Sequence, residues 1–377
     1  MDLSYNEQQK AIKTTAHDFF EANCPMTLVR ELEESAPGYS PDLWKQMADL
    51  QWLGMTYPEQ YGGTGGGFLD LYVIYEEMGR FLIPTPHLSS VILSGETILR
   101  TGSEEQKRRT LPPIAKGELL VAPAVMEPNG TFGPKGIELE AKAEGGGYKL
   151  NGTKLLVPFA HVSNYLLCLA RTHRSADPAE GITLFLVDRK EPGISLEALP
   201  NTAGYRLFAV TFDNVTVGQD TVVGKANEGW QPFAEVSNRA VVLQCGEIVG
   251  AADSVLEMST DYAKDRVQFG RQIGSFQAVQ YLCSDIAIDM TSTSLLAKQA
   301  AWLIDEGVDH GREVAIAGAN ASKAIEHVTR QAHEVHAGVA FMLEHDLQLF
   351  TRRAKNWEMN LGDAAYHQEA LAVAMGL

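Results

Sequence analysis

Residues 265–280 read "DRVQFGRQIGSFQAVQ" and join two long segments with helical periodicity. Arg266 is a permanent cation whose planar fork can bind a pyrophosphate through two hydrogen bonds. Phe269 offers an aromatic face and Gln277 offers an amide, so together the three side chains could hold a nucleotide. The same stretch could instead end a helix, with Arg266 in solvent and Phe269 in a core. The sequence on either side of this stretch is needed to choose between the two interpretations.

The chain changes character twice around this stretch. In residues 1–119 apolar residues recur three and four apart between glycine- and proline-rich breaks, which predicts helices. Residues 120–225 show short apolar or alternating runs, and an Asn-Gly pair at 151–152 predicts a hairpin turn. Residues 226–377 return to long amphipathic segments, typical of an antiparallel bundle. Since no crossover helices separate the strands, we expect an antiparallel barrel in the middle, not a Rossmann domain.

Two helices have predictable ends. Ser103 can cap a helix whose first turn holds Glu104 and Glu105, and Pro112–Pro113 are expected to end it. The segment 234–266 can form a single helix of about nine turns.

Composition excludes several classes of protein. The formal net charge of −17 argues against a nucleic-acid-binding surface. The N-terminal stretch is polar and amphipathic, unlike a signal peptide, and no apolar run reaches the roughly 18–20 residues that span a bilayer. Four scattered cysteines without a CxxC pair favour a reducing cytoplasm over disulfides or a zinc site. We therefore expect a cytoplasmic protein with no metal site.

Four further phrases, with the opening stretch, resemble the acyl-CoA dehydrogenase family in order and spacing. They are "TYPEQYGG" at 56–63, "GSEEQKRRTLPPIAKGE" at 102–118, "MEPNG" at 126–130 and "HEVHAGVAFMLEHDLQLFTRRAK" at 333–355. The resemblance implies an α+β fold with three domains. These are an N-terminal α-helical domain at 1–119, a middle antiparallel β-barrel domain at 120–225 and a C-terminal four-helix bundle at 226–377.

The resemblance also implies a reaction and a cofactor. In the family a carboxylate removes the α-proton of an acyl-CoA thioester while FAD takes the β-hydrogen as hydride. The segment from Arg266 through Phe269 to Gln277 reaches across a dimer interface to a neighbour's FAD. The other residues that the resemblance assigns to FAD are Val125, Met126, Thr131, Glu334 and Gly338. An electron-transfer flavoprotein is the acceptor that it suggests.

This chain departs from the family where the base should stand. One usual position falls on Leu361, and the other falls on Ala240 or its neighbour Arg239. Glu358 and Asp363 are close to Leu361 in sequence, but helical geometry turns neighbouring side chains by about 100° each. Glu247 stands one heptad beyond Ala240 among apolar residues, so it faces a similar direction about 10 Å further along.

The residues that the resemblance places beside the flavin are altered as well, because Phe132 and Pro158 stand where the family often has hydroxyl residues, and Glu334 replaces a glutamine. Two hypotheses follow. The chain is either an active dehydrogenase in which Glu247 is a relocated base, or a partner subunit that completes the FAD site of a second, dehydrogenase-like chain. Phrases near the C-terminus are most similar to the heteromeric α2β2 enzymes that act on steroid side chains. In the second case Glu247 is a structural acid paired with a cation.

Overall fold

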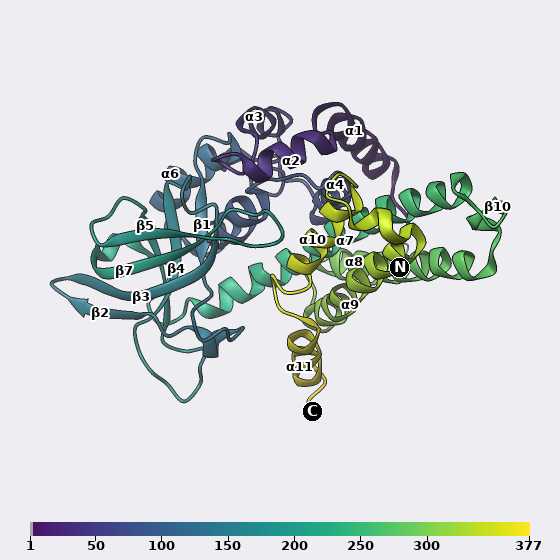
Figure 1. Ribbon diagram of the computed structural model, residues 1–377. Coiled ribbons are helices and arrows are strands. Elements are labelled where there is room, and N and C mark those ends of the chain that lie inside the picture. Colours follow the sequence, from purple (N-terminus) through teal and green to yellow (C-terminus); the bar gives the residue numbers. More distant parts are fainter. Residues whose placement is uncertain (1–2) are drawn as a thin grey trace. The chain divides into compact units, whose positions relative to one another are not determined.

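The structure is a computed structural model that describes residues 3–377, and it follows the predicted order of helices, strands and helices (Figure 1). Contacts group the chain into two compact units. Unit 1 comprises the described part of Met1–Glu31 with Gly67–Ile83 and Val241–Leu377, and unit 2 comprises Leu32–Gly66 and Pro84–Ala240. These units combine segments that are far apart in sequence, so the division into three domains stays a prediction.

Unit 1 is built from helices. They are α1 (Glu7–Asn23), α4 (Phe68–Arg80), α8 (Gln277–Asp305), α9 (Gly311–His336), α10 (Leu347–Trp357) and α11 (Ala364–Ala374), with most of α7 (Trp230–Asp265). Short 3₁₀ turns at η5 (Ile273–Ser275) and η6 (Ala337–Phe341) and a hairpin of β9 (Val267–Gln268) and β10 (Arg271–Gln272) complete it. Helix α2 (Met26–Glu34) spans the boundary between the units.

Unit 2 combines short helices with all the strands of the large sheet. Its helical segments are α3 (Pro41–Asp49), η1 (Glu59–Tyr61), the π-helix η2 (His87–Glu96), α5 (Thr97–Thr101), α6 (Glu104–Ala115), η3 (Pro134–Gly136) and η4 (Gln219–Thr221). Its strands are β1 (Val121–Ala124), β2 (Glu140–Glu144), β3 (Gly147–Pro158), β4 (Tyr165–Arg171), β5 (Ile182–Asp188), β6 (Ile194–Leu199), β7 (Leu207–Gly218) and β8 (Val222–Val223).

The sheet runs in the order β6-β7-β3-β2-β4-β5-β8, and most neighbouring strands are antiparallel as predicted. Strand β1 differs, because it pairs parallel to β4, and β2 meets β4 in a single parallel pair. The inward side chains of β3, β4, β5 and β7 form one apolar core, which includes Leu150, Cys168, Phe185 and Phe212.

The predicted turn at Asn151–Gly152 is wrong. Both residues lie inside β3, where the register against β7 shifts between Leu150 and Gly152. The hairpin turn lies at Gly145–Gly146, which have φ of 62° and 85° and join β2 to β3. Glycine takes two consecutive positive φ values without strain, since it has no Cβ to clash, so the Gly-Gly pair suits this turn.

Helix ends were partly predictable. Helix α7 is continuous for 36 residues, and Ser103 caps α6 by accepting a hydrogen bond from Gln106 N. Pro112 and Pro113 do not end α6, which continues to Ala115. The two prolines remove backbone donors, and the burial of Leu111, Ile114 and Ala115 keeps this last turn helical.

Helices α4 and α7 cross in unit 1 at unusually short backbone distance, and glycines make the crossing possible. A Cβ on Gly250 of α7 would lie 1.7 Å from Glu76 O of α4, and one on Gly79 would lie 1.9 Å from Glu247 O. Gly246 packs in the same way against the ring of Tyr72. The glycines beside Glu247 are thus packing residues that hold this stretch of α7 against α4.

Candidate functional site

Glu247 is the one residue of 240–252 on α7 that is not fully buried. Its neighbours, among them Val242, Leu243 and Ala251, are inaccessible. Glu247 itself is of intermediate exposure, so it is the partly accessible polar side chain of this buried length of helix. A carboxylate in such surroundings has to be hydrogen-bonded or paired, since burying it alone is costly.

The end of α10 supplies the partners. Trp357 Nε1 donates to Glu247 Oε2 at 2.9 Å, and the fully buried Arg353 contributes a positive charge nearby. Burial raises the pKa of the Glu247 carboxyl to about 7. The hydrogen bond from the indole and the positive charge of Arg353 both act to lower this pKa. A pKa near neutrality allows the group to accept and release a proton at physiological pH.

The other candidate acids, Asp363 and Glu358, have structural contacts, and so does Arg239. Asp363 caps α11 by accepting from Tyr366 N at 2.8 Å, and Glu358 pairs with Lys355 at 2.8 Å. In unit 2, Arg239 lies 3.7 Å from Glu96, while Ala240 is fully buried. Leu361 follows Trp357 by four residues. Glu247 is therefore hydrogen-bonded to the segment in which the sequence predicts one of the usual base positions.

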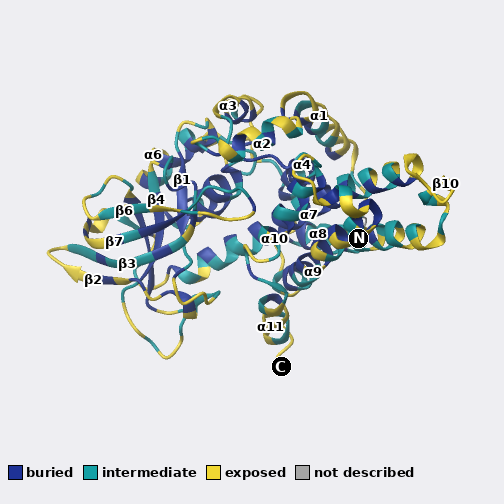
Figure 2. Cartoon of the chain, in the orientation of Figure 1, coloured by how far each residue is buried: buried dark blue, intermediate teal, exposed yellow. Residues whose placement is uncertain are grey.

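The opening stretch forms an exposed hairpin at the tip of α7 and α8 (Figure 2). The ring of Phe269 is 90% exposed, and Arg266 is exposed at its base. Arg271 lies over the ring of Phe276 at 4.1 Å, and Gln277 donates to the Tyr281 hydroxyl at 2.8 Å. The sequence left open whether Phe269 enters a core, and the structure shows that it does not.

The loop after α9 contains Gly338, which the resemblance assigns to FAD. Ala337 beside it takes an unusual backbone conformation, with φ 55° and ψ −140°. Gly338 has open space around it, and Glu334 is exposed in the last turn of α9. An acid beside the negative end of a helix dipole does not favour a bound anion. The ring of His336 stacks on Tyr262 at 4.7 Å, which ties this loop to the last turns of α7.

Val125, Met126 and Thr131 lie in unit 2. The carbonyls of Val125 and Met126 accept hydrogen bonds from Lys154 Nζ and Leu155 N. Thr131 is exposed.

A buried ion pair fixes this stretch. Lys154 Nζ lies 2.6 Å from Glu127 Oε1, and the Glu127 carboxylate also accepts from the N–H groups of Glu138 and Leu139. This pair was missed from the sequence, although the glutamate stands in "MEPNG" and the lysine in "KLLVPFA". It holds the stretch by contacts that span more than 25 residues.

The structure separates the predicted residues of unit 1 into two places. Arg266 directly follows the last residue of α7 and lies 19 residues beyond Glu247, which puts the two about 28 Å apart along the helix axis. Glu334 and Gly338 lie toward the Arg266 end of α7, because the neighbouring His336 stacks on Tyr262 in the last turns of that helix. One chain therefore carries the partly accessible carboxylate of Glu247 and, far from it along α7, the exposed hairpin with Arg266 and Phe269.

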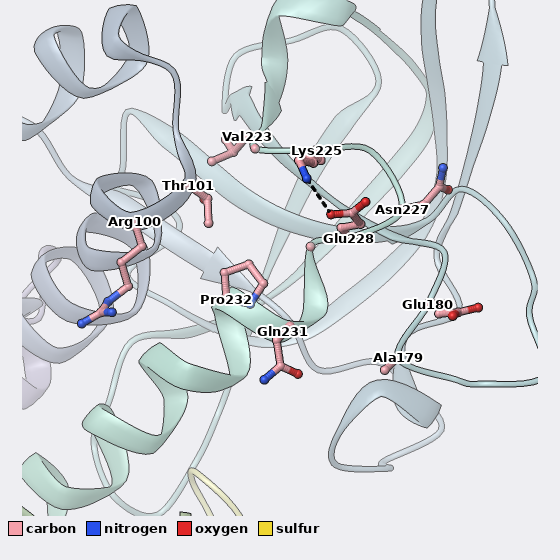
Figure 3. Close-up of a pocket in the computed structure, with 12 residues that line it drawn as sticks. Arg100, Thr101, Ala179, Glu180, Val223, Lys225, Asn227, Glu228, Gln231 and Pro232 are labelled. Carbon is pink, nitrogen blue, oxygen red and sulfur yellow. Dashed lines mark ion pairs between the residues drawn. The ribbon is translucent and has the colours of Figure 1, made fainter. Parts of the chain in front are cut away.

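Unit 2 also contains a separate open cavity of about 600 Å³ at the first turn of α7 (Figure 3). Arg100, Thr101, Gln231 and Pro232 line it, with an ion pair between Lys225 and Glu228 at 3.3 Å. None of the predicted site residues lines this cavity. Within residues 3–377 no group of three or more His, Cys, Asp or Glu is placed to hold a metal ion. None of the helices described is long and apolar enough to cross a membrane.

Comparison with known proteins gives concordant matches along the chain. Models of the N-terminal, middle and C-terminal domains of acyl-CoA dehydrogenases match residues 6–118, 122–215 and 227–376. The acryloyl-CoA reductase (NADH) of Anaerotignum propionicum is 27% identical over 99% of this chain and 95% of its own. The caffeyl-CoA reductase–Etf complex subunit CarC of Acetobacterium woodii is 27% identical over 98% of both chains.

Solved structures agree with the sequence matches. A chain of the ChsE4–ChsE5 complex from Mycobacterium tuberculosis superimposes with a TM-score of 0.90 at 27% identity, covering 100% of this chain and 99% of that one.

Proposed function

The chain belongs to the acyl-CoA dehydrogenase family, and we propose that it catalyses the FAD-dependent α,β-dehydrogenation of an acyl-CoA thioester, with Glu247 as the base. The observation that carries the proposal is the hydrogen bond from Trp357 to Glu247. It joins the partly accessible acid of α7 to the segment in which many family members carry their base. In a family relative that works in the reverse direction, as a reductase, the group that acts as base here would instead return the proton to the substrate.

The properties of Glu247 suit a proton acceptor. It is partly accessible, its pKa is raised to about 7 by burial, and one of its oxygens is held by Trp357. Abstraction of the α-proton by this carboxylate leaves charge on the thioester enolate, whose neutralisation requires departure of the β-hydrogen. The bound FAD supplies the acceptor for that hydride.

The residues fit FAD on one side of the chain only. The family binds FAD. The exposed Arg266 and Phe269 combine a cation for a pyrophosphate with an aromatic face, and both project from the hairpin. Glu334 at the C-terminal end of α9 does not fit an anion. The hairpin is therefore suited to hold FAD that lies largely on another subunit, and the loop after α9 is not.

That asymmetry favours a second candidate function. In this alternative the chain is a catalytically incomplete subunit that completes the FAD site of a different dehydrogenase subunit in an α2β2 complex. Arg266 lies about 28 Å from Glu247 along α7, so in either function the hairpin would contact FAD at the reacting centre of another subunit. Large apolar side chains are exposed on the hairpin and on α8, namely Val267, Phe269, Tyr281, Ile288 and Leu295. In both cases we propose a homo- or hetero-tetramer in the cytoplasm, with an electron-transfer flavoprotein as acceptor.

The two functions are distinguished by the flavin content of the chain purified alone. The active dehydrogenase should hold FAD stoichiometrically and be bleached by one of a set of straight-chain, branched or polycyclic acyl-CoA thioesters. The partner subunit should hold little FAD until it is mixed with a second dehydrogenase-like chain. One tightly held FAD per subunit in the isolated chain contradicts the partner function.

The base is tested by Glu247→Gln, which keeps the shape of the side chain and removes its proton affinity. Bleaching by the same thioester should fall by several orders of magnitude, with FAD content unchanged. Unaltered reduction kinetics would exclude Glu247 as the base.

The hairpin is tested by Arg266→Ala, with Arg271→Ala on the same hairpin as the matched control. Arg266→Ala should weaken FAD retention in the active complex, whereas Arg271 is engaged with Phe276 and its loss should have a smaller effect. Equal FAD retention in both variants and the wild type would contradict the role assigned to Arg266.

A further inference from the structure

Both the side chain and the backbone carbonyl of Trp357 are hydrogen-bonded to α7. The side chain is 3% exposed, and its Nε1 donates to Glu247 Oε2 at 2.9 Å. Its backbone carbonyl accepts from Gln244 Nε2 at 2.9 Å, and Gln244 Oε1 in turn accepts from Asn360 Nδ2 at 3.0 Å. Helix α7 and the segment at and just after the end of α10 are therefore joined by three hydrogen bonds, one of which is made to the Glu247 carboxylate.

We propose that Trp357 is a positioning residue for Glu247, whose indole N–H holds one carboxylate oxygen and directs the other toward the substrate. This inference rests on the proposed function of Glu247 as a base. An indole N–H can only donate, so it cannot compete for the proton that the carboxylate takes up. A buried ring with two restricted torsions also fixes the direction of the bond more closely than a flexible polar side chain.

The indole also favours the ionised carboxylate, because a hydrogen bond donated to an anion stabilises the anion. Helices α4 and α10 both place titratable groups near this part of α7. Helix α10 contributes the cation of Arg353, and α4 contributes Tyr72 and Glu76 at the crossing. Glu76 is itself neutralised by Lys13 at 2.8 Å and approached by Lys298 at 3.7 Å. Arg353 and the indole are thus the groups that oppose the effect of burial on Glu247.

Removal of the indole N–H should raise the pKa of Glu247 further. A hydrogen bond to a charged group is strong enough to account for a change of about one pH unit or more. Ionised Glu247 should then be about tenfold scarcer at pH 6 than in the wild type.

The test variant is Trp357→Phe, which keeps an aromatic ring and removes only the donor. Trp302→Phe on α8 is the matched control for loss of an indole. The carboxyl resonance of Glu247 is followed against pH by NMR of protein labelled with ¹³C-glutamate and assigned through its absence in Glu247→Gln. This measurement needs no turnover. The acidic limb of the pH profile for acyl-CoA-driven flavin bleaching is recorded alongside it.

We expect both the resonance and the acidic limb to move up by about one pH unit in Trp357→Phe and to stay in place in Trp302→Phe. An unchanged Glu247 titration in Trp357→Phe overturns the inference, even where Glu247→Gln abolishes bleaching and the proposed function stands. Conversely, bleaching that survives in Glu247→Gln overturns the proposed function, while the titration still reports on the indole.

A second measurement uses the wild type and avoids any folding defect of the variant. Of the five tryptophan indole N–H resonances, that of Trp357 should titrate with the same midpoint as Glu247 and should lose this titration in Glu247→Gln. Absence of a titrating indole resonance in the wild type overturns the inference.

Discussion

Glu247→Gln should stabilise the protein in a pH-dependent way, and the size of the effect follows from its environment. The carboxyl pKa is about 7 in the folded protein, against an ordinary value of 4.5. At ~1.36 kcal/mol for each pH unit, and with allowance for partial accessibility, ionising the folded group costs about 2–3 kcal/mol.

The sign of the pH dependence is fixed because the folded pKa is raised. Below pH 4.5 the group is protonated in both the folded and the unfolded chain, so it does not lower the free energy of unfolding. Between pH 4.5 and 7 the folded protein retains a proton that the unfolded chain has lost, and stability falls as pH rises. Above pH 7 the full cost is present. Glutamine resembles the protonated acid, and its carbonyl oxygen can still accept the hydrogen bond from Trp357. The free energy of unfolding of Glu247→Gln should therefore not fall with pH on account of residue 247.

The assay is urea unfolding followed by tryptophan fluorescence at pH 4.5, 6 and 8, for the wild type, Glu247→Gln and a control, Glu21→Gln, at an exposed acid on α1. Glu247→Gln should match the wild type within error at pH 4.5 and exceed it by about 2–3 kcal/mol at pH 8. The control should stay close to the wild type throughout. A constant difference across the three pH values, or a less stable variant at pH 8, would refute the assignment of a burial-raised pKa to Glu247.

Three further changes test other contacts. Lys154→Met removes the cation that neutralises the buried Glu127, so the protein should lose about 3–5 kcal/mol of unfolding free energy in a urea titration. Gly250→Ala places a Cβ 1.7 Å from a backbone oxygen of α4 and should cost about 3 kcal/mol or more, whereas Gly338→Ala enters open space and should change thermal stability little. Asp305→Ala removes the carboxylate that accepts from the first two N–H groups of α4, which should lower stability by about 1 kcal/mol and increase amide exchange there.

Each change has an outcome that contradicts its argument. A neutral Lys154→Met variant would mean that the ion pair does not fix the stretch behind β3. Equal effects of the two glycine substitutions would mean that the close crossing of α4 and α7 is not what requires glycine. Unchanged exchange at the start of α4 would exclude the cap.

The sequence alone determined the class of fold, the order of its parts and the family, because local periodicity and short phrases are set by residues that are neighbours in the chain. It predicted α7 and the cap at Ser103, and it drew attention to Glu247 as an acid among apolar residues. It misplaced the turn before β3 and the end of α6, since a bulge in Asn151–Gly152 and a helical Pro-Pro depend on pairing and packing rather than on local preference.

Only the tertiary structure decided the surroundings of the candidate site. Glu247 and Trp357 are 110 residues apart, and no local pattern links an acid on one helix to an indole on another. The raised pKa of Glu247 comes from burial by residues far along the chain, and the exposure of Phe269 depends on a hairpin that a helix-end pattern does not reveal. Burial and the distance between side chains are properties of the packed chain, so they have no counterpart in the order of residues.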